Sequence, residues 1–233
     1  MKYALITGAG RGLGSGFVEY LLSQDYFVFA GVREIKPNFE KRPNLHYVVL
    51  DVSSDDSIEK ASQEISAHTL NLDLLVNNAA VNKDSVTNNH KELVCRLRDL
   101  KREFLLEMFN INSISPLMII QKFLHLLKSD PSFIINISSC RASFHDEFIS
   151  SNPNYGYAGS KIALNMFTYG LSKELPKNIK VFAVHPGSVK TDMNKEGDQL
   201  PYNQAEKIIA ITKNWKDKHN GMFMRWSGEE YPL

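Results

Sequence analysis

A tyrosine and a lysine stand four residues apart in Tyr157-Ala158-Gly159-Ser160-Lys161, which places both side chains on one face of a helix. An isolated tyrosine titrates near ~10, and an acid/base for neutral pH needs that pKa lowered by roughly two to three units, or about 3–4 kcal/mol. One ammonium group at ~4–5 Å supplies about that much at an effective dielectric near ~20. Tyr157 could therefore exchange a proton with a substrate oxygen. The alternative is a helix with no catalytic role, in which the tyrosine is packed and the lysine is exposed.

Tyr155 competes with Tyr157 by proximity, but four residues beyond Tyr155 stands Gly159, which has no charge to offer. We therefore assign the acid/base role to Tyr157.

A glycine-rich segment, Thr7-Gly8-Ala9-Gly10-Arg11-Gly12-Leu13-Gly14, lies between a predicted first strand and a predicted first helix. Glycines permit positive φ and let the backbone approach a diphosphate, and the N–H groups of a helix N-terminus bind anions. The segment predicts a dinucleotide-binding turn. A plain strand-to-helix turn is the alternative, which we disfavour because so many glycines would cost backbone entropy without return.

Two arginines bear on the kind of dinucleotide. Arg11 opposes the dipole of the helix that follows unless an anion lies nearby. Arg33 follows the second predicted strand, where a site for NAD(H) more often carries an acid. Both arginines can converge on a 2′-phosphate, so NADP(H) is favoured over NAD(H). The alternative is that both are solvated, and Glu34 could partly neutralise Arg33.

The elements that must position these residues alternate along the chain. Near-continuous apolar runs predict buried parallel strands at Tyr3–Ile6, Tyr26–Val32, Leu45–Leu50, Leu72–Val76, Phe133–Ile137 and Ile179–His185. Helical patterns fall at Gly12–Ser23, Ser54–Ala67, Leu97–Leu127 with a possible break before Asn112, Tyr157–Leu175 and Asn203–Trp215. This alternation predicts an α/β fold of one domain, residues 1–233: a doubly wound, Rossmann-type parallel sheet with helices on both faces and the ligand at the carboxyl ends of the strands.

Composition narrows the classes of function. The 233 residues carry a formal net charge of +1, so no overall field favours nucleic acid or a membrane surface. Cys95 and Cys140 lack C-x-x-C spacing, which fits a reducing compartment and argues against a metal. No room for a signal peptide precedes the first strand, and Pro116–Leu127 is too short and too polar to span a bilayer. We expect a cytoplasmic protein.

These motifs, in this order, resemble the short-chain dehydrogenase/reductase family over nearly the whole chain. Asp51-Val52 is similar to the family's adenine-contacting pair, Asn77-Asn78-Ala79 to its Asn-Asn-Ala segment, and Pro186-Gly187-x-Val189-x-Thr191-Asp192 to its turn beside the nicotinamide. The resemblance implies a cofactor site formed by Gly8, Gly10, Arg11, Gly12, Leu13, Gly14, Arg33, Asp51, Val52, Asn78, Ala79, Tyr157, Lys161, Pro186, Gly187, Val189 and Thr191.

The resemblance also implies the catalytic residues Asn112, Ser139, Tyr157 and Lys161. Tyr157 would donate a proton to the carbonyl oxygen as hydride arrives, and Ser139 would hydrogen-bond that oxygen. Lys161 would hold the ribose and lower the pKa of the phenol, and Asn112 would anchor a water in a proton relay. The run from Tyr155 to Met166 and the ending Gly221–Gly228 resemble the C-factor and sniffer type of carbonyl reductase.

Two departures from the family pattern occur. Ala80 stands where glycine is usual, and the gap from Ser139 to Tyr157 is longer than usual. The added residues fall in a polar segment, Ser143–Asn154, which we expect to form a rim over the substrate. A metal at His145-Asp146-Glu147 is conceivable there, but a solvated acidic loop is favoured.

Rival functions are a regulatory or interaction protein that senses NADP(H) without turnover, and a hydrolase. The chain has no G-x-S-x-G elbow, which disfavours the hydrolase. The expected partner is a small carbonyl or alcohol substrate. Copies of the chain could pair as a dimer or tetramer through the two long predicted helices. The sequence leaves substrate identity and reaction direction open.

Overall fold

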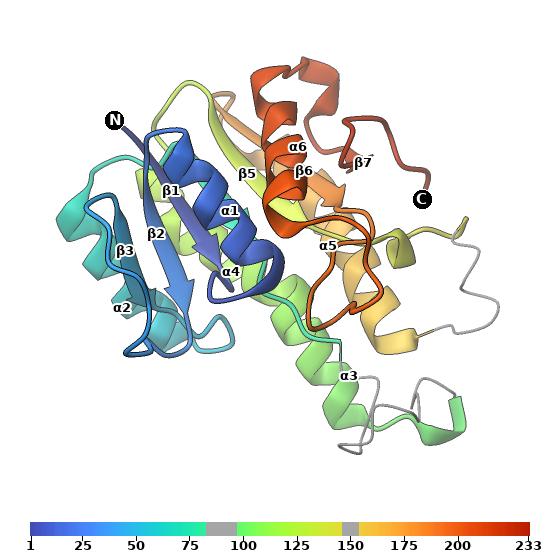
Figure 1. Ribbon diagram of the computed structural model, residues 1–233. Helices are drawn as coiled ribbons and strands as arrows, with labels where there is room; N and C mark the ends of the chain where they lie inside the picture. The colour runs from blue at the N-terminus through green and yellow to red at the C-terminus, as the bar shows by residue number, and fades with distance from the viewer. Residues whose placement is uncertain (83–96, 146–153) are drawn as a thin grey trace.

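The computed structural model describes residues 1–82, 97–145 and 154–233. One sheet of seven strands forms its centre, in the order β3-β2-β1-β4-β5-β6-β7, with each strand parallel to its neighbours (Figure 1). The strands are β1 (Lys2–Thr7), β2 (Tyr26–Val32), β3 (Leu45–Val49), β4 (Leu74–Asn77), β5 (Ser132–Ile137), β6 (Ile179–His185) and β7 (Phe223–Arg225).

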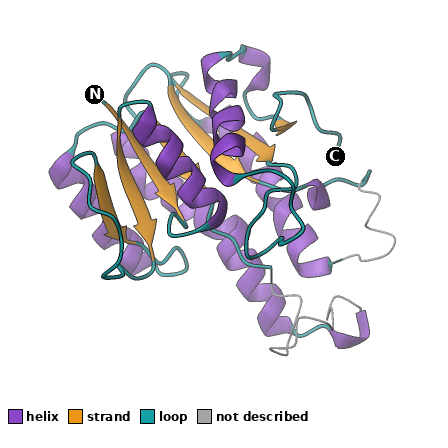
Figure 2. Ribbon diagram, viewed as in Figure 1, coloured by secondary structure: helices purple, strands orange, loops and turns teal. Residues whose placement is uncertain are grey.

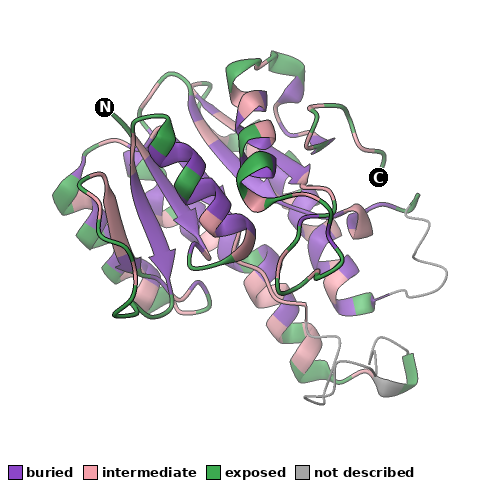
Figure 3. Cartoon of the chain, in the orientation of Figure 1, coloured by how far each residue is buried: buried purple, intermediate pink, exposed green. Residues whose placement is uncertain are grey.

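Helices cover both faces of this sheet (Figure 2). They are α1 (Gly12–Ser23), α2 (Asp55–His68), α3 (Arg102–Phe109), α4 (Ser115–Phe123), α5 (Tyr155–Glu174) and α6 (Pro201–Lys213). Side chains of α1 and α6 share one apolar cluster with one face of the strands, and side chains of α2 and α4 share a second cluster with the other face. The central strands are therefore buried between two layers of helices, whereas the edge strand β3 is mostly half-buried (Figure 3). Burial on both sides explains why the sequences of the central strands are apolar on both faces.

The order of the strands fixes where a ligand can bind. From β1 the sheet grows in one direction through β2 and β3, and in the other through β4, β5, β6 and β7. The order reverses between β1 and β4, and such a reversal opens a crevice at the carboxyl ends of the strands. The predicted doubly wound parallel sheet is confirmed.

The predicted helix over Leu97–Leu127 is interrupted in the structure. A 3-10 turn at Leu97–Asp99 precedes α3, and the π-helical segment Asn110–Ile114 separates α3 from α4. The break suggested before Asn112 is therefore present, as a π-helical segment that contains this asparagine. The short strand β7 has no counterpart among the predicted strands.

The span Arg102–Leu126 meets a test for a membrane-crossing helix by length and composition alone, with 39% of its most apolar window buried inside the protein. Core helices of proteins that never enter a bilayer meet the same test, and α4 packs here against α2 and the sheet.

Candidate active site

The glycine turn joins β1 to α1 at the crevice. Gly8 has φ +64°, and a Cβ atom there would lie 2.9 Å from Cα of Ala79. A Cβ atom on Gly14 would lie 2.2 Å from the carbonyl oxygen of Gly8, so the first turn of α1 packs directly on the loop before it. Any larger residue at either position would push the turn away from β4 or from the helix. The turn is held open as a bare-backbone surface at a helix N-terminus, which suits a diphosphate.

The end of β4 is bonded to this turn through Thr7 and Asn78. The Oγ1 of Thr7 accepts hydrogen bonds from the backbone N–H groups of Asn78 and Ala79, each at 3.0 Å. The side-chain amide of Asn78 donates to the carbonyl oxygens of Thr7 at 3.0 Å and Gly8 at 3.1 Å. Asn78 thus braces the turn. Thr7 takes part in the same brace and is missing from the predicted cofactor set, although it heads the glycine motif in the sequence.

Arg11 is the residue before α1, and its side chain caps no backbone group of the helix. Its Nη1 lies 2.9 Å from Oδ2 of Asp192, with both side chains about three-quarters exposed. The anion expected beside Arg11 at the N-terminus of α1 is therefore the carboxylate of Asp192, a group of the protein itself. The ion pair joins the glycine turn to the segment that follows β6, so Arg11 does not need a phosphate to explain its place.

Arg33 is exposed at the end of β2 and lies near Asp51, which follows β3. The pKa of the Asp51 carboxyl is lowered, first by hydrogen bonds from the side chain and backbone of Ser53 and then by the charge of Arg33. Those bonds measure 2.7 Å and 3.0 Å to Oδ1. Val52 is buried beside it. An ionised carboxylate and a guanidinium thus stand together at the carboxyl ends of β2 and β3.

Tyr157 and Lys161 lie in the first two turns of α5, whose N-cap is Asn154. The side-chain oxygen of Asn154 accepts from the backbone N–H of Tyr157 at 3.3 Å, and Asn154 itself has φ +41°, a left-handed conformation that asparagine tolerates. The Nζ of Lys161 lies 5.9 Å from the centre of the Tyr157 ring. The predicted helical pairing of the phenol and the amine is present in the structure.

Lys161 is almost wholly buried, with 2% of its surface exposed. Its Nζ donates to the carbonyl oxygen of Ile137 at 2.6 Å, at the last residue of β5. Burial lowers the pKa of this lysine from 10.5 to about 7, because the charged form loses its water. The alternative of a non-catalytic helix with an exposed lysine is therefore excluded for Lys161.

Ser139 follows β5 by two residues and caps a 3-10 turn, Cys140–Ala142, where its Oγ accepts from the backbone N–H of Arg141 at 3.2 Å. This turn packs against α5. Ser138 beside it donates to Oδ1 of Asn165 at 2.7 Å, a second tie between β5 and α5. The serine and the Tyr157-Lys161 pair therefore belong to two segments that the fold holds in contact.

Asn112 is fully buried in the π-helical segment. Its Oδ1 accepts from the backbone N–H of Val81 at 2.8 Å, and its Nδ2 donates to the carbonyl oxygen of Val81 at 2.9 Å and to Oγ of Ser160 at 3.0 Å. Ser160 in turn donates to the carbonyl oxygen of Tyr157 at 2.8 Å. The Asn112 side chain thus ties the segment after β4 to the helix that carries Tyr157. π-helical segments recur at functional sites.

The segment Pro186–Thr191 runs from the end of β6 back to the glycine turn. Gly187 has φ +79°, Val189 is buried, and the Thr191 methyl carbon would lie 3.2 Å from a Cβ atom added to Gly12. The predicted cofactor residues from β1, β2, β3, β4 and β6 thus gather along one edge of the sheet, together with the catalytic candidates after β5.

Of the expected rim Ser143–Asn154, residues 146–153 lie outside the described chain, as does Cys95. Among the residues that are described, no group of three or more His, Cys, Asp or Glu side chains could hold a metal ion. The Nδ1 of His145 donates to the carbonyl oxygen of Leu233, 2.9 Å away.

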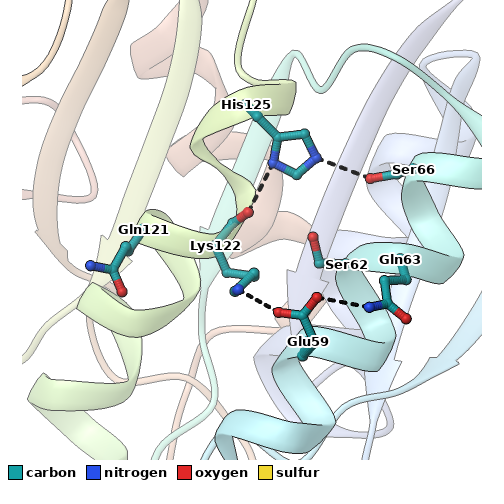
Figure 4. A pocket seen from close by; sticks show the side chains of 7 residues that line it. All are labelled: Glu59, Ser62, Gln63, Ser66, Gln121, Lys122 and His125. Carbon is teal, nitrogen blue, oxygen red and sulfur yellow. Dashed lines mark hydrogen bonds and ion pairs between the residues drawn. The ribbon is translucent and has the colours of Figure 1, made fainter.

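A separate hollow of about 410 Å³ lies between α2 and α4 (Figure 4). The charged side chains Lys122 and Glu59 that line it form an ion pair with each other, and Glu59 also accepts a hydrogen bond from Gln63. His125 contacts Ser66 across it at 3.1 Å. No residue of the predicted site lines this hollow.

The fold and this edge of the sheet define a Rossmann-type dinucleotide-binding protein. The model of the short chain dehydrogenase family matches residues 2–200, and the chain belongs to that family. It is an oxidoreductase that uses a nicotinamide dinucleotide, as the sequence predicted.

Solved structures support this assignment. An NADPH-bound carbonyl reductase from chicken fatty liver is 29% identical, with a TM-score of 0.86, and the alignment covers 100% of this chain and 99% of that one. The carbonyl reductase Sniffer of D. melanogaster is 28% identical, with a TM-score of 0.86 and full coverage of both chains. A 3-oxoacyl-acyl-carrier-protein reductase from Aquifex aeolicus is 31% identical over 82% of this chain and 75% of its own length. The resemblance to sniffer-type carbonyl reductases is confirmed.

Proposed function

We propose that this chain reduces the carbonyl group of a small molecule with NADPH, and that Tyr157 is the proton donor. The observation that carries the proposal is the burial of Lys161 one helical turn beyond Tyr157, with its amine aimed at the end of β5. A core lysine costs stability, and an apolar residue would fill the same space without that cost. A buried lysine beside the phenol of Tyr157 therefore points to acid/base chemistry.

Four side chains divide the work in this proposal. Tyr157 gives its proton to the substrate oxygen, and the hydroxyl of Ser139 donates a second hydrogen bond to the same oxygen as negative charge develops. Lys161, in its protonated form, stabilises the phenolate that remains, and its amine binds the ribose. Asn112 acts through its bonds to Val81 and Ser160, which hold the helix of Tyr157 in place, and it stays the proposed anchor for the relay water.

The residues present fit a dinucleotide. The bare surface around Gly8 and Gly14 leaves space that side chains would fill, and the uncapped start of α1 offers backbone N–H groups to a diphosphate. In this proposal Asp51 and Val52 would contact the adenine, and Pro186, Gly187, Val189 and Thr191 would lie beside the nicotinamide. When bound, the nicotinamide supplies or accepts the hydride.

The preference for NADPH over NADH is part of the proposal and rests on charge. Arg33 is exposed and directly follows β2, and the chicken carbonyl reductase of similar fold has NADPH bound. Arg11 can add a second contact through guanidinium N–H groups other than the one that bonds Asp192, or by leaving Asp192. Because that ion pair is exposed, its separation costs at most about 1 kcal/mol, less than the ~1.5–3 kcal/mol that a charge-assisted bond to phosphate returns.

The test is steady consumption of NADPH by the purified chain with a panel of aldehydes and ketones, followed at 340 nm and repeated with Tyr157→Phe. A reductase consumes NADPH with at least one carbonyl and loses that activity in the variant. A protein that only senses NADP(H), the alternative, binds the cofactor without oxidising it. NADPH binding without turnover over the whole panel would favour that alternative.

A cytoplasmic location, a single functional domain over residues 1–233 and pairing of copies through the predicted helices Leu97–Leu127 and Tyr157–Leu175 stay predictions. Cell fractionation, limited proteolysis and sedimentation would test them in turn.

A further inference from the structure

Gln204 lies in the first turns of α6 and is fully buried. Glutamine is seldom wholly removed from water, because both ends of its amide then need partners. The Nε2 of Gln204 donates to the carbonyl oxygen of Pro186, the first residue after β6. Its Oε1 has no hydrogen-bond partner within the described parts of the chain. The buried amide of Gln204 therefore makes one hydrogen bond, to the turn that begins at Pro186.

The turn that Gln204 contacts is held from a second side. A Cβ atom on Gly187 would lie 3.0 Å from two ring atoms of Trp226 and 3.3 Å from Nε2 of Gln204. The backbone N–H of Trp226 donates to the carbonyl oxygen of His185 at 3.0 Å, which fixes the indole beside the strand end. The Pro186-Gly187 turn is thus enclosed between an amide and an aromatic ring.

Beyond the turn, the chain reaches the glycine turn of β1. Thr191 packs against Gly12, and Asp192 pairs with Arg11. Tyr157 and Ser139 belong to the other side, after β5. A bound dinucleotide would have its diphosphate at the N-terminus of α1 and its reactive ring beside Pro186 and Gly187. The Pro186-Gly187 turn would then act on the nicotinamide half of the cofactor, because the adenine half would lie at the ends of β2 and β3.

We propose that Gln204 is a positioning residue, which sets the Pro186-Gly187 turn at the place needed by the nicotinamide ring without touching the cofactor. Methionine has a similar length and would remove the unpaired Oε1 from the core, but it would also remove the donor to the Pro186 oxygen. The bond to this turn, and not the packing of the side chain, is therefore what sets glutamine apart from methionine here. The inference rests on the proposed dinucleotide chemistry, but not on the choice between NADPH and NADH.

The experiment compares two ligands in wild type and Gln204→Met by calorimetry. NADPH carries both halves of the cofactor, and 2′,5′-ADP carries only the adenine half. In the variant we expect NADPH to bind about three- to tenfold more weakly, the effect of one neutral hydrogen bond, and kcat to fall by at least as much. The affinity for 2′,5′-ADP should stay within about twofold of wild type, on the same scale of effect.

Asn203→Met is the matched control, because it makes the same exchange of an amide for a thioether at the exposed neighbouring position. It should leave both ligands unaffected. Equal weakening of NADPH and 2′,5′-ADP by Gln204→Met would overturn the inference, since the residue would then support the whole site. Unchanged NADPH affinity and kcat would overturn it as well.

Gln204→Glu serves if Gln204→Met does not fold. A protonated carboxyl can donate to the Pro186 oxygen, and an ionised one repels it. The affinity of the variant for NADPH, divided by that of wild type, should therefore rise as the pH is lowered from 8 to 6, while the same ratio for 2′,5′-ADP stays constant. A ratio for NADPH that does not change with pH would refute the positioning role.

Failure of the proposed function looks different, because wild type would then bind no NADPH or turn over no carbonyl. If the chain prefers NADH, that cofactor and ADP form the corresponding pair of ligands.

Discussion

Replacing Lys161 with methionine should abolish activity and yet stabilise the protein at neutral pH. The lysine is buried, and burial lowers its pKa from 10.5 to about 7. Between these two values the unfolded chain binds a proton at this amine that the folded chain does not. Folding stability therefore rises with pH through this window and is lost as pH falls from 10.5 towards 7. Methionine removes the ionisable group and keeps a similar side-chain volume.

The size of the effect follows from the two pKa values. Burying the amine costs about 4 kcal/mol at pH 7 and about 2 kcal/mol at pH 9. Methionine also removes the donor to the Ile137 carbonyl, which costs about 1–3 kcal/mol. The net gain at pH 7 is about 1–3 kcal/mol, and it should shrink by about 2 kcal/mol by pH 9. In a chain of this length the gap in Tm between variant and wild type should change by roughly 4–8 °C over that range.

Thermal unfolding of both proteins at several pH values between 7 and 9 measures this gap, with NADPH oxidation as the activity assay. Lys173→Met on the same helix is the control, because water reaches that ammonium group in the folded chain. Its gap to wild type should not depend on pH. If the gap for Lys161→Met is equally independent of pH, the amine is hydrated or paired and the reasoning from burial is wrong.

Three further changes probe the site. Tyr157→Phe should remove nearly all reductase activity and leave cofactor affinity nearly unchanged, because the ring still packs; retained turnover would disprove the acid role. Arg33→Ala should lower kcat/KM for NADPH by about ten- to a hundredfold and spare NADH, since a charge-assisted bond to phosphate contributes ~1.5–3 kcal/mol; equal loss with both cofactors would contradict the phosphate contact. Gly14→Ala should weaken both cofactors alike in a binding titration, because its Cβ meets the Gly8 carbonyl at 2.2 Å; wild-type affinity would show that the turn yields without cost.

The sheet was predictable from sequence because each buried strand is a short apolar run bounded by turn residues. The edge strand β7 was not, since Phe223–Arg225 is only three residues long and ends in an exposed arginine. The π-helical segment at Asn112 was foreseen only as a possible break. Within it Ser113 and Ser115 donate to the carbonyl oxygens of Phe109 and Asn110, and bonds of this kind cannot be predicted from hydroxyl residues in a helical pattern.

Sequence alone likewise predicted some residues of the candidate site and missed the partners of others. Tyr157, Lys161 and the glycines follow from spacing, because helical periodicity and backbone space are local properties. The partners of Arg11 and Gln204 are not local. Asp192 follows Arg11 by 181 positions, and Pro186 precedes Gln204 by 18. Sequence reasoning assigned the anion near Arg11 to a ligand because nothing in the chain identifies Asp192 as the nearer charge.

Three of the buried polar atoms without a partner in the described chain also fall near this edge of the sheet, whereas Nε1 of Trp215 belongs to a ring that contacts Phe133 near the start of β5. Within the described chain, Asn77 leaves its Oδ1 without a partner at the end of β4, Asn165 its Nδ2 beside Ser138 after β5, and Gln204 its Oε1 after β6. Each such atom costs about 1–3 kcal/mol. Each of the three side chains also makes one bond that ties a strand end to its neighbour, to α5 or to α6. A stability-optimised core would contain apolar residues at these positions, so their presence at three successive strand ends indicates that the carboxyl edge is built to hold its geometry at the expense of stability.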